Sequence, residues 1–510
     1  MKKKILICNL FLFSCLSLAS CQILRPSTSD TGSDDSNTTI NSDTIVVPQS
    51  SSDTSVHKAS SIQIIGVTDL HGACVDQPYT YGHYSMGLAK MSTYFANLSE
   101  NKTTFTLSVG DMWQGSIESN YNYGAYVTEA MNIMNFDAMA VGNHEFDWGI
   151  EKIEDNSKIA DFPFLAANVR TKDTNELIKG VHASTLIEKD GVKLGVIGTI
   201  GQDQYKDISY NRVKDLVFTE KKDIVLAEAK SLKESGADMI VLLSHEDFSS
   251  KNLNDDRRAI LDSGMIDLVL DGHTHTRNVD SYKNIPILRA ASNGIAYDIV
   301  NIDLSKDVPS IKSADVKYFS ENDFKNTSYD SKVVELCEKK YDVEEYRNTV
   351  IATSTDSISK SNFAKVVAES IYDKITTTLQ FQYFDLYGAF TNVTRKDVPK
   401  GPITIGLMWE VLPFDNEILL MTLKGSTIKR CDTNDNSVLN LGTEPGIYPF
   451  DIRGQFKDDE YYNIAVIDYL GYKIKDEYIV DEVIHTNFYM RDLTIDFLMK
   501  TETLNASRYL

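Results

Sequence analysis

The sequence predicts an α/β domain over residues 61–325 and a second, smaller domain over residues 351–510. Two observations predict this organisation. From residue 61 to about residue 305, short β-branched runs alternate with amphipathic stretches of helical spacing, which is the pattern of an α/β fold. Asp, His and Asn residues directly follow several of the apolar runs. Since open α/β sheets bind ligands beyond the carboxyl ends of their strands, we expect the functional site there.

The first twenty residues predict an export signal. Three lysines, Lys2 to Lys4, precede an apolar run over residues 5–18, which is too short and too early for a membrane-spanning helix of the mature chain. Leu18-Ala19-Ser20-Cys21 resembles the bacterial lipobox, in which the cysteine becomes the lipidated first residue. The alternative is a plain secretory peptide cut nearby. We expect an extracytoplasmic protein, lipid-anchored through Cys21 to the outer face of a bacterial cell membrane.

Residues 21–60 predict a disordered tether. They are mostly Ser, Thr, Asp, Asn and Gly, with one brief apolar patch at residues 44–47. Such a segment buries too little apolar surface to offset the entropy of ordering the chain. We expect it to hold the folded part away from the membrane.

Composition excludes several classes of protein. The net charge of -22 repels polyanions, so nucleic acid polymers are not expected partners. Beyond the tether the cysteines are Cys74, Cys337 and Cys431, an odd number at wide spacing. This pattern predicts neither a disulfide framework nor a cysteine-rich metal site.

Five apolar runs of the first domain are predicted strands, at residues 62–67, 105–109, 139–141, 239–243 and 268–270. Helices are predicted at residues 86–98 and 223–233, and residues 191–197 predict a turn followed by a further strand. Residues 326–350 form the predicted linker, with a charged helix at residues 332–346. The second domain is predicted to contain a helix at residues 362–375 and strands near residues 419–423 and 462–468.

Polar residues stand at all five predicted strand ends: Asp69 and His71, then Asp111, then Asn143, His144 and Asp147, then His245, then His273 and His275. One such histidine is more often hydrogen-bonded than metal-bound. Five of the nine histidines in this same context favour ligands, because parallel strands bring their carboxyl ends to one edge. Residues 140–149, taken alone, are equally compatible with a polar turn.

Oxygen and imidazole ligands without thiolates suit Mn²⁺, Zn²⁺, Fe²⁺ or Co²⁺. Two such ions, about 3.5–4 Å apart, can clamp the phosphoryl oxygens during an in-line displacement. A hydrolase with a single metal ion does not need this many ligands. The sequence therefore predicts a dinuclear centre that cleaves phosphoesters.

The motifs Asp-x-His, Gly-Asp-x-x-Gln-Gly, Gly-Asn-His-Glu-Phe-Asp, Ser-His and Gly-His-Thr-His, in this order, resemble those of the calcineurin-like metallophosphoesterases. More narrowly, the chain resembles the 5'-nucleotidase family over about residues 60–510, and residues 162–169 also match that group. The resemblance implies a four-layer αββα sandwich, joined by a helix to a smaller α+β substrate-binding domain.

The resemblance also implies roles for individual residues. One metal ion would be held by Asp69, His71, Asp111 and His275, and the other by Asp111, Asn143, His245 and His273. His144 would contact the phosphate and stabilise the transition state with help from Asp147. Glu145 would then serve structure. The residues expected to contact substrate are Asn143, Arg395, Phe414, Asn416 and Tyr469.

The second domain departs from the family pattern. Where relatives have Pro-Phe-Gly-Asn, this chain has Pro413-Phe414-Asp415-Asn416. The glycines that relatives carry before the position of Arg395 are absent, and so is their Gly-Gly-Asp-Gly stretch. Either Tyr469 or Tyr472 would be the second stacking aromatic.

The expected function is that of a 5'-nucleotidase acting outside the cell on small nucleotides. Related alternatives are a 2',3'-cyclic phosphodiesterase, a 3'-nucleotidase and a UDP-sugar hydrolase. A surface lipoprotein that binds a ligand and has vestigial catalysis is the alternative from another class. The complete ligand set disfavours it, and the altered motifs of the second domain favour it.

Overall fold

A computed structural model describes residues 44–47, 58–306, 308–432, 448–450 and 456–509. The predicted signal and Cys21 lie outside these residues. Among the described residues, no helix combines the length and the apolar character needed to span a bilayer.

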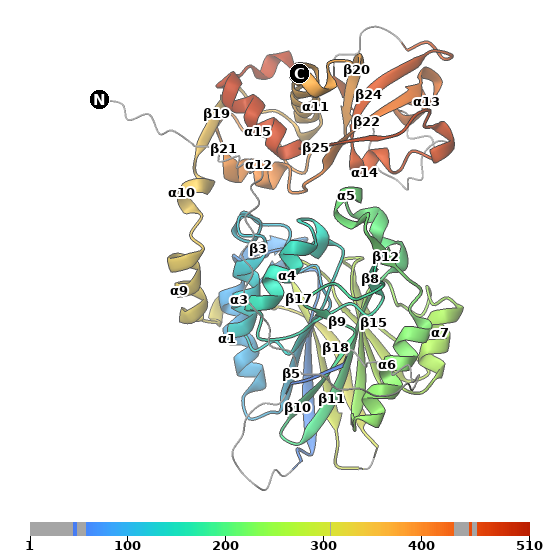
Figure 1. The fold of residues 1–510 in the computed structure, drawn as a ribbon. Helices are drawn as coiled ribbons and strands as arrows, with labels where there is room; N and C mark the ends of the chain where they lie inside the picture. Colours follow the sequence, from blue (N-terminus) through green and yellow to red (C-terminus); the bar gives the residue numbers. More distant parts are fainter. Residues whose placement is uncertain (1–43, 48–57, 307, 433–447, 451–455, 510) are drawn as a thin grey trace, which may run out of the picture. The chain divides into compact units, whose positions relative to one another are not determined.

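Two seven-stranded sheets form the first domain (Figure 1). In spatial order, one sheet contains β18 (Ser310–Tyr318), β17 (Ala296–Asp303), β2 (Ser61–Val67), β5 (Thr104–Ser108), β6 (Ala138–Ala140), β7 (Phe164–Leu165) and β9 (Val181–His182). The other contains β1 (Thr44–Val47), β10 (Ser184–Lys189), β11 (Val192–Ile200), β13 (Met239–His245), β14 (Leu268–Asp271), β16 (Ile285–Ala290) and β15 (Arg277–Tyr282). The five predicted strands are therefore divided between two sheets rather than aligned along one edge.

The two sheets face each other across a buried apolar cluster. β2 contributes Ile64 to this cluster, β5 contributes Leu107, β11 contributes Val196, and β13 contributes Val241 and Leu243. Each fully buried side chain of this kind stabilises the fold by about 1.5–3 kcal/mol. Sheet-on-sheet packing thus forms the centre of the domain.

Helices cover both outer faces, with α6 (Lys222–Glu234) and α7 (Asp255–Asp262) on one side and α1 (Leu88–Ser99) and α3 (Ala125–Ile133) on the other (Figure 1). Ile240 and Leu242 of β13 alternate with its inward residues and pack with Val225 of α6. A strand covered on both faces is apolar throughout, which explains the continuous run at residues 239–243. The predicted four-layer αββα arrangement is confirmed.

The apolar patch within the predicted tether forms a strand, while most of residues 21–60 lie outside the described residues. Thr44–Val47 forms β1, which pairs in parallel with β10, so that Thr44 lies opposite Ser184. Without β1, β10 would be an edge strand with unpaired backbone groups. Every residue of this short segment is β-branched, which gives it strand propensity.

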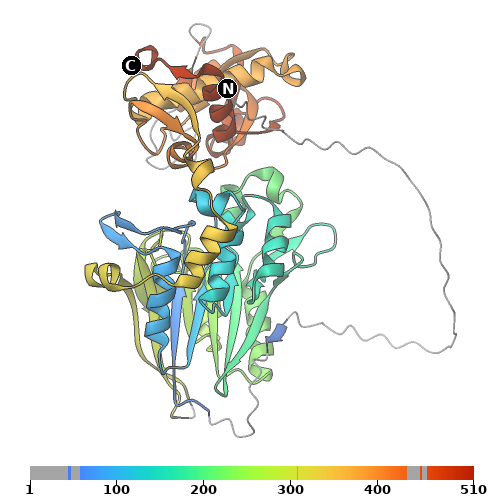
Figure 2. The same ribbon diagram turned by 90° about the vertical axis from the view of Figure 1, so that its left-hand side faces the viewer.

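The predicted linker helix is broken in two. Its parts are α9 (Ser331–Lys340) and α10 (Glu344–Arg347), and α9 packs on α1 and α3 (Figure 2). The Asp342 side chain accepts a hydrogen bond from the Glu344 backbone at 2.9 Å. Such a local side-chain bond competes with helix continuation and caps the following turn, so the charged pattern alone overestimated the helix.

The second domain is α+β. Its five-stranded sheet contains, in order, β23 (Tyr448–Phe450), β20 (Leu386–Thr391), β24 (Tyr461–Ile467), β22 (Glu417–Lys424) and β25 (Ile484–Tyr489). A smaller sheet contains β21 (Gly401–Thr404), β19 (Val350–Ser354) and β26 (Thr503–Leu504). Helices α11 (Lys360–Thr377), α12 (Ile405–Val411) and α15 (Met490–Thr501) pack with these sheets around one apolar core.

Asp298 of β17 is a buried carboxyl group for which no hydrogen-bond donor is found among the described residues. Burial raises its pKa well above the usual value, and Asp271 adds to the effect while Arg289 opposes it. Gly66 of β2 leaves room for it, because a Cβ atom there would lie 2.7 Å from the Asp298 Oδ2 atom. The fold therefore favours the protonated form of this side chain.

Asp298→Asn should stabilise the protein increasingly as the pH rises above 4. Above the ordinary aspartate pKa of 3.8, the unfolded wild-type chain releases a proton that the native state retains. Wild-type stability therefore falls by about 1.4 kcal/mol per pH unit until the native pKa is reached, and the amide variant lacks this loss. Urea unfolding at pH 4 and pH 7 measures the difference.

Asp303→Asn on the same strand is the matched control. Lys312 lowers the pKa of Asp303 below its ordinary value of 3.8, so its contribution to stability is nearly complete by pH 4 and the effect of this substitution should change little between pH 4 and pH 7. An advantage of Asp298→Asn that stays constant between pH 4 and pH 7 would contradict the assignment of a protonated carboxyl.

Candidate metal centre

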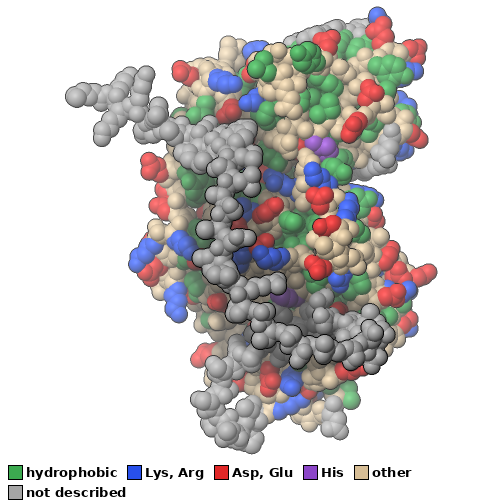
Figure 3. Space-filling model, viewed as in Figure 1, with side chains coloured by type: hydrophobic (Ala, Val, Ile, Leu, Met, Phe, Trp, Pro, Cys, Tyr) green, Lys and Arg blue, Asp and Glu red, His purple; other side chains and the backbone are tan. Residues whose placement is uncertain are grey.

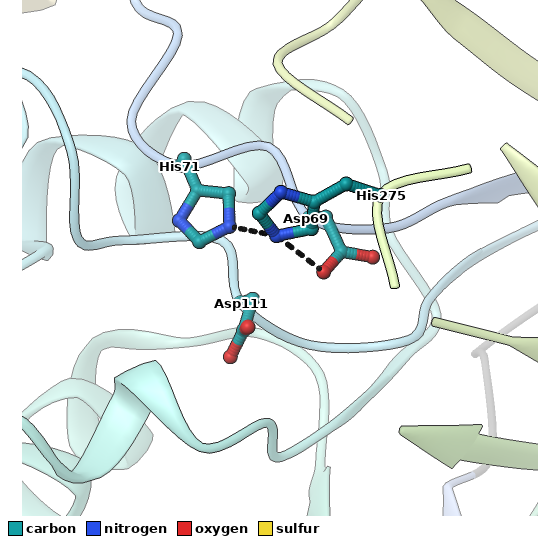
Figure 4. Close-up of side chains that lie close together, drawn as sticks. All are labelled: Asp69, His71, Asp111 and His275. Carbon is teal, nitrogen blue, oxygen red and sulfur yellow. Dashed lines mark hydrogen bonds and ion pairs between the residues drawn. The ribbon is translucent and has the colours of Figure 1, made fainter. Parts of the chain in front are cut away.

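The ends of the two sheets bring the predicted ligands together. Asp69, His71, Asp111 and His275 form one group, and Asp111, His245 and His273 form another. Within each group the candidate ligand atoms lie within 4.8 Å of one another. Asp111 belongs to both groups, as expected for a bridging carboxylate. Figure 4 shows the four side chains of the first group.

In the first group, the imidazoles of His71 and His275 and the carboxylate of Asp69 converge. The Nε2 atoms of His71 and His275 are 2.9 Å apart, and His275 Nε2 lies 3.4 Å from Asp69 Oδ1 (Figure 4). His71 Nδ1 donates to the Gln114 carbonyl at 2.9 Å. This bond fixes the tautomer and leaves the Nε2 lone pair of His71 for a ligand.

The second group is ordered in the same way. His245 Nδ1 donates to the Val109 carbonyl at 2.7 Å, so its Nε2 lone pair faces Asp111 Oδ2 at 3.0 Å. The amide oxygen of Asn143 lies 3.2 Å from His245 Nε2 and 3.0 Å from His273 Nδ1. All seven predicted ligands therefore meet in one region, Asn143 included.

These residues fit divalent cations. Asp111 Oδ2 is buried and makes no well-aligned hydrogen bond within the described residues, and His245 Nε2 lies 3.0 Å from it. Burying a carboxylate without compensation costs several kcal/mol. A cation removes that cost, and the oxygen and nitrogen donor set suits borderline or hard divalent ions.

The ligands stand on backbone that ordinary residues rarely adopt. Left-handed φ values occur at Asp69 (50°), His71 (50°), Asp111 (53°), His273 (70°) and His275 (57°). Each costs about 1–3 kcal/mol and persists only where the surrounding structure enforces it. Strain concentrated at ligands is typical of a functional site.

Glu145 binds the backbone of two ligand loops, in keeping with the structural role that the resemblance implies. Its buried carboxylate accepts backbone hydrogen bonds from Asp111 and Met112, both at 2.8 Å, and from Gly142 at 2.7 Å. One side chain thus joins the loop that carries Asp111 to the loop that carries Asn143.

His144 and Asp147 form the predicted pair beside the ligands. His144 Nδ1 lies 2.7 Å from Asp147 Oδ2, and the His144 backbone donates to Asp111 Oδ1 at 2.8 Å. Burial alone would lower the pKa of His144, but the carboxylates of Asp147 and Asp111 raise it to about 10. These two carboxylates therefore favour the protonated form of the imidazole at the edge of the centre.

A cavity of about 260 Å³ is lined by residues of the metal centre and of the second domain. The two domains belong to one compact unit, Ser42–Leu510. All the predicted substrate residues line the cavity: Asn143, Arg395, Phe414, Asn416 and Tyr469. The Phe414 ring lies 6.1 Å from the His144 ring and 5.1 Å from the Arg395 guanidinium. Tyr472 also lines the cavity.

Sequence reasoning missed several cavity residues. Asp207 Oδ2 lies 3.9 Å from His273 Nε2, and Lys206 lines the cavity beside it. Asp468 accepts a hydrogen bond from Asn416 Nδ2 at 2.8 Å, and the ammonium of Lys473 lies 3.5 Å from the Tyr469 ring centroid. No motif predicts Lys206, Asp207 or Asp468 as cavity residues, because only the fold brings them to the cavity.

Comparisons with known proteins agree with both domains. The family model for calcineurin-like phosphoesterases matches residues 62–277, which include all seven predicted ligands. The model for the 5'-nucleotidase C-terminal domain matches residues 341–440, which include Arg395, Phe414 and Asn416.

Individual relatives agree as well. The chain is 24% identical over 399 residues to a snake venom 5'-nucleotidase of Crotalus adamanteus, covering 70% of this chain and 66% of the relative. It is 23% identical over 435 residues to the trifunctional nucleotide phosphoesterase protein YfkN of Bacillus subtilis, covering 72% of this chain and 29% of the relative. Each match thus spans less than two thirds of the relative's own length.

A solved structure has the same fold. The 5'-nucleotidase precursor from Thermus thermophilus superimposes with a TM-score of 0.64 at 19% identity, over 87% of this chain and 97% of that one. The chain therefore consists of a calcineurin-like phosphoesterase domain followed by a 5'-nucleotidase C-terminal domain.

Proposed function

We propose that the protein is a dinuclear-metal phosphoester hydrolase that releases phosphate from nucleotides, chiefly as a 5'-nucleotidase. The observation that carries this proposal is the pair of ligand groups that share Asp111, beside the His144–Asp147 pair and open to a cavity. The two matched domains and the printed activities of the relatives support it.

The residues divide the chemistry between them. Asp69, His71, Asp111 and His275 would hold one ion, and Asp111, Asn143, His245 and His273 the other. Divalent ions bound there supply Lewis acidity to the phosphoryl group. Since Asp147 occupies Nδ1 of His144, Nε2 is the atom available to donate to a phosphoryl oxygen as negative charge develops.

The second domain would bind the leaving group. Phe414 offers an aromatic face for a base, and Arg395 places a cation beside that ring. Asn416 offers polar atoms next to them, and Tyr469 completes the lining with Asn143 at the metal side. The partner is then a small phosphoester. On the face shown in Figure 3, the described residues interleave acidic and basic side chains and form no continuous basic tract.

A second candidate function lies in the same class. A relative of this chain is a trifunctional nucleotide phosphoesterase, and this chain lacks the Gly-Gly-Asp-Gly stretch of 5'-nucleotidases. These two observations favour additional activity on 2',3'-cyclic nucleotides, 3'-nucleotides or UDP-sugars.

A substrate panel tests the proposal. Phosphate release is measured with Mn²⁺ from AMP, 3'-AMP, 2',3'-cyclic AMP and UDP-glucose, with metal-stripped protein as the control. AMP should give the highest kcat/KM, and the stripped protein should be inactive. Protein that binds metal yet cleaves none of these, nor an aryl phosphate, would be a binding lipoprotein instead of an enzyme.

His144→Ala should lower kcat by about 10²-fold or more while metal content stays unchanged, as expected for lost transition-state stabilisation. His83→Ala is the matched control, because His83 stacks on Tyr318 at 3.7 Å, outside the cavity. Turnover and bound metal are measured on the same samples. Loss of metal from His144→Ala would make this residue a ligand and refute its proposed role.

We further propose that a lipid on Cys21 anchors the protein outside the cell, from the Leu-Ala-Ser-Cys sequence. Cys21→Ala should move the protein from the membrane fraction of an expressing bacterium to the soluble extracytoplasmic fraction, because the thiol that carries the lipid is gone. Cys431→Ala, in the second domain, serves as the control. Unchanged membrane association of Cys21→Ala would exclude the anchor.

A further inference from the structure

Arg289 of β16 is a buried arginine, 2% exposed, that contacts two of the ligand loops. Its Nε and Nη2 atoms donate to the two carboxylate oxygens of Asp271 at 2.9 and 2.5 Å. Nη2 also donates to Asp247 Oδ1 at 2.7 Å. Nη1 donates to the hydroxyl groups of Thr274 and Thr276, the latter at 2.9 Å. A single guanidinium therefore binds four side chains.

The partners of Arg289 bracket the metal ligands in the sequence. Asp271, Thr274 and Thr276 alternate with His273 and His275 along one loop. Asp247 lies two residues after His245 on the other loop, and Asp271 Oδ2 also accepts from the Phe248 backbone at 2.9 Å. Arg289 thus binds side chains on both of the loops that carry these three histidine ligands.

The backbone of the loop does not hold this conformation by itself. β14 is paired as far as Asp271, which lies opposite Ser244 of β13, and the next residue in a strand ladder is Arg277 of β15. Between them, His273 and His275 are left-handed, at φ 70° and 57°. Such residues need enforcement from outside the loop.

We propose that Arg289 is a positioning residue that sets the metal affinity of the centre by holding the loops of His245, His273 and His275. The planar guanidinium has five donors in a fixed fork and can hold two carboxylates and two hydroxyls at once, which a lysine ammonium cannot do. This inference rests on the metal centre of the proposed function and adds a determinant outside the ligands.

Two variants test it by different routes. Arg289→Lys keeps a buried positive charge between Asp247 and Asp271 but loses the fork. Thr274→Val with Thr276→Val leaves those charges untouched and removes only the hydroxyl ties of a partly exposed loop, so folding is retained. Arg277→Lys is the matched control, because Arg277 binds Asp315 and the Val316 carbonyl, away from the ligands.

Mn²⁺ affinity is measured by calorimetry on metal-stripped full-length protein, and the Tm of the stripped protein is measured in parallel. Arg289→Lys should weaken binding by about 10–100-fold, the range for lost outer contacts of metal ligands. The threonine pair should weaken it less, and Arg277→Lys should leave it unchanged. Because both changes act on one loop, adding the threonine pair to Arg289→Lys should cost little more.

Unchanged Mn²⁺ affinity in Arg289→Lys and in the threonine pair, even with a lowered Tm, would show a merely structural role and overturn the inference. Additive losses in the combined variant would overturn the shared mechanism. A wild-type protein that binds no Mn²⁺ refutes this inference together with the metal centre. A wild-type protein that binds Mn²⁺ without cleaving phosphoesters refutes the proposed function alone, and the affinities still decide the role of Arg289.

Discussion

The three hydrogen bonds to the Glu145 carboxylate are the interaction on which the metal centre depends. They bind the backbone of Asp111, Met112 and Gly142, so two loops from neighbouring strands share one acceptor. A buried N–H group without a partner costs about 1–3 kcal/mol. The shared ligand Asp111 is thereby fixed in its strained conformation, and its Oδ1 atom in turn receives the His144 backbone.

In each sheet of the sandwich, a buried polar side chain joins two of the ligand loops. Glu145 joins the loops that follow β5 and β6, and Arg289 joins the loops that follow β13 and β14. The Asp69 carboxylate joins the two halves, because it accepts from the His273 backbone at 3.0 Å. The ligand geometry thus depends on three polar links between loops, while the apolar cluster between the sheets fixes the distance between their ends.

The sequence predicts local features of this centre better than its assembly. Apolar runs followed by Asp, His or Asn located β2, β5, β6, β13 and β14, because buried strands are continuous in hydrophobicity. Periodicity carries no information on which sheet a strand joins, so the division into two sheets came only from the family resemblance. Arg289 had no sequence signal, since its partners are 13–42 residues away. The break before α10 and the pairing of β1 likewise depend on side-chain and edge contacts that a pattern does not encode.

The cavity has a further property that the aromatic motif did not indicate. Arg395 lies beside Phe414, the first predicted stacking ring, and Lys473 lies over Tyr469, one of the two candidates for the second ring. A cation–π contact contributes about 0.5–2 kcal/mol, and stacking of a base on an aromatic side chain about 1–3 kcal/mol. A base can therefore displace a cation from a ring face at little net cost. The displaced cation remains close to the bound nucleotide, whose anionic phosphate attracts it. Cations on the stacking rings are thus compatible with nucleotide binding, and they favour bases attached to an anionic group over neutral nucleosides.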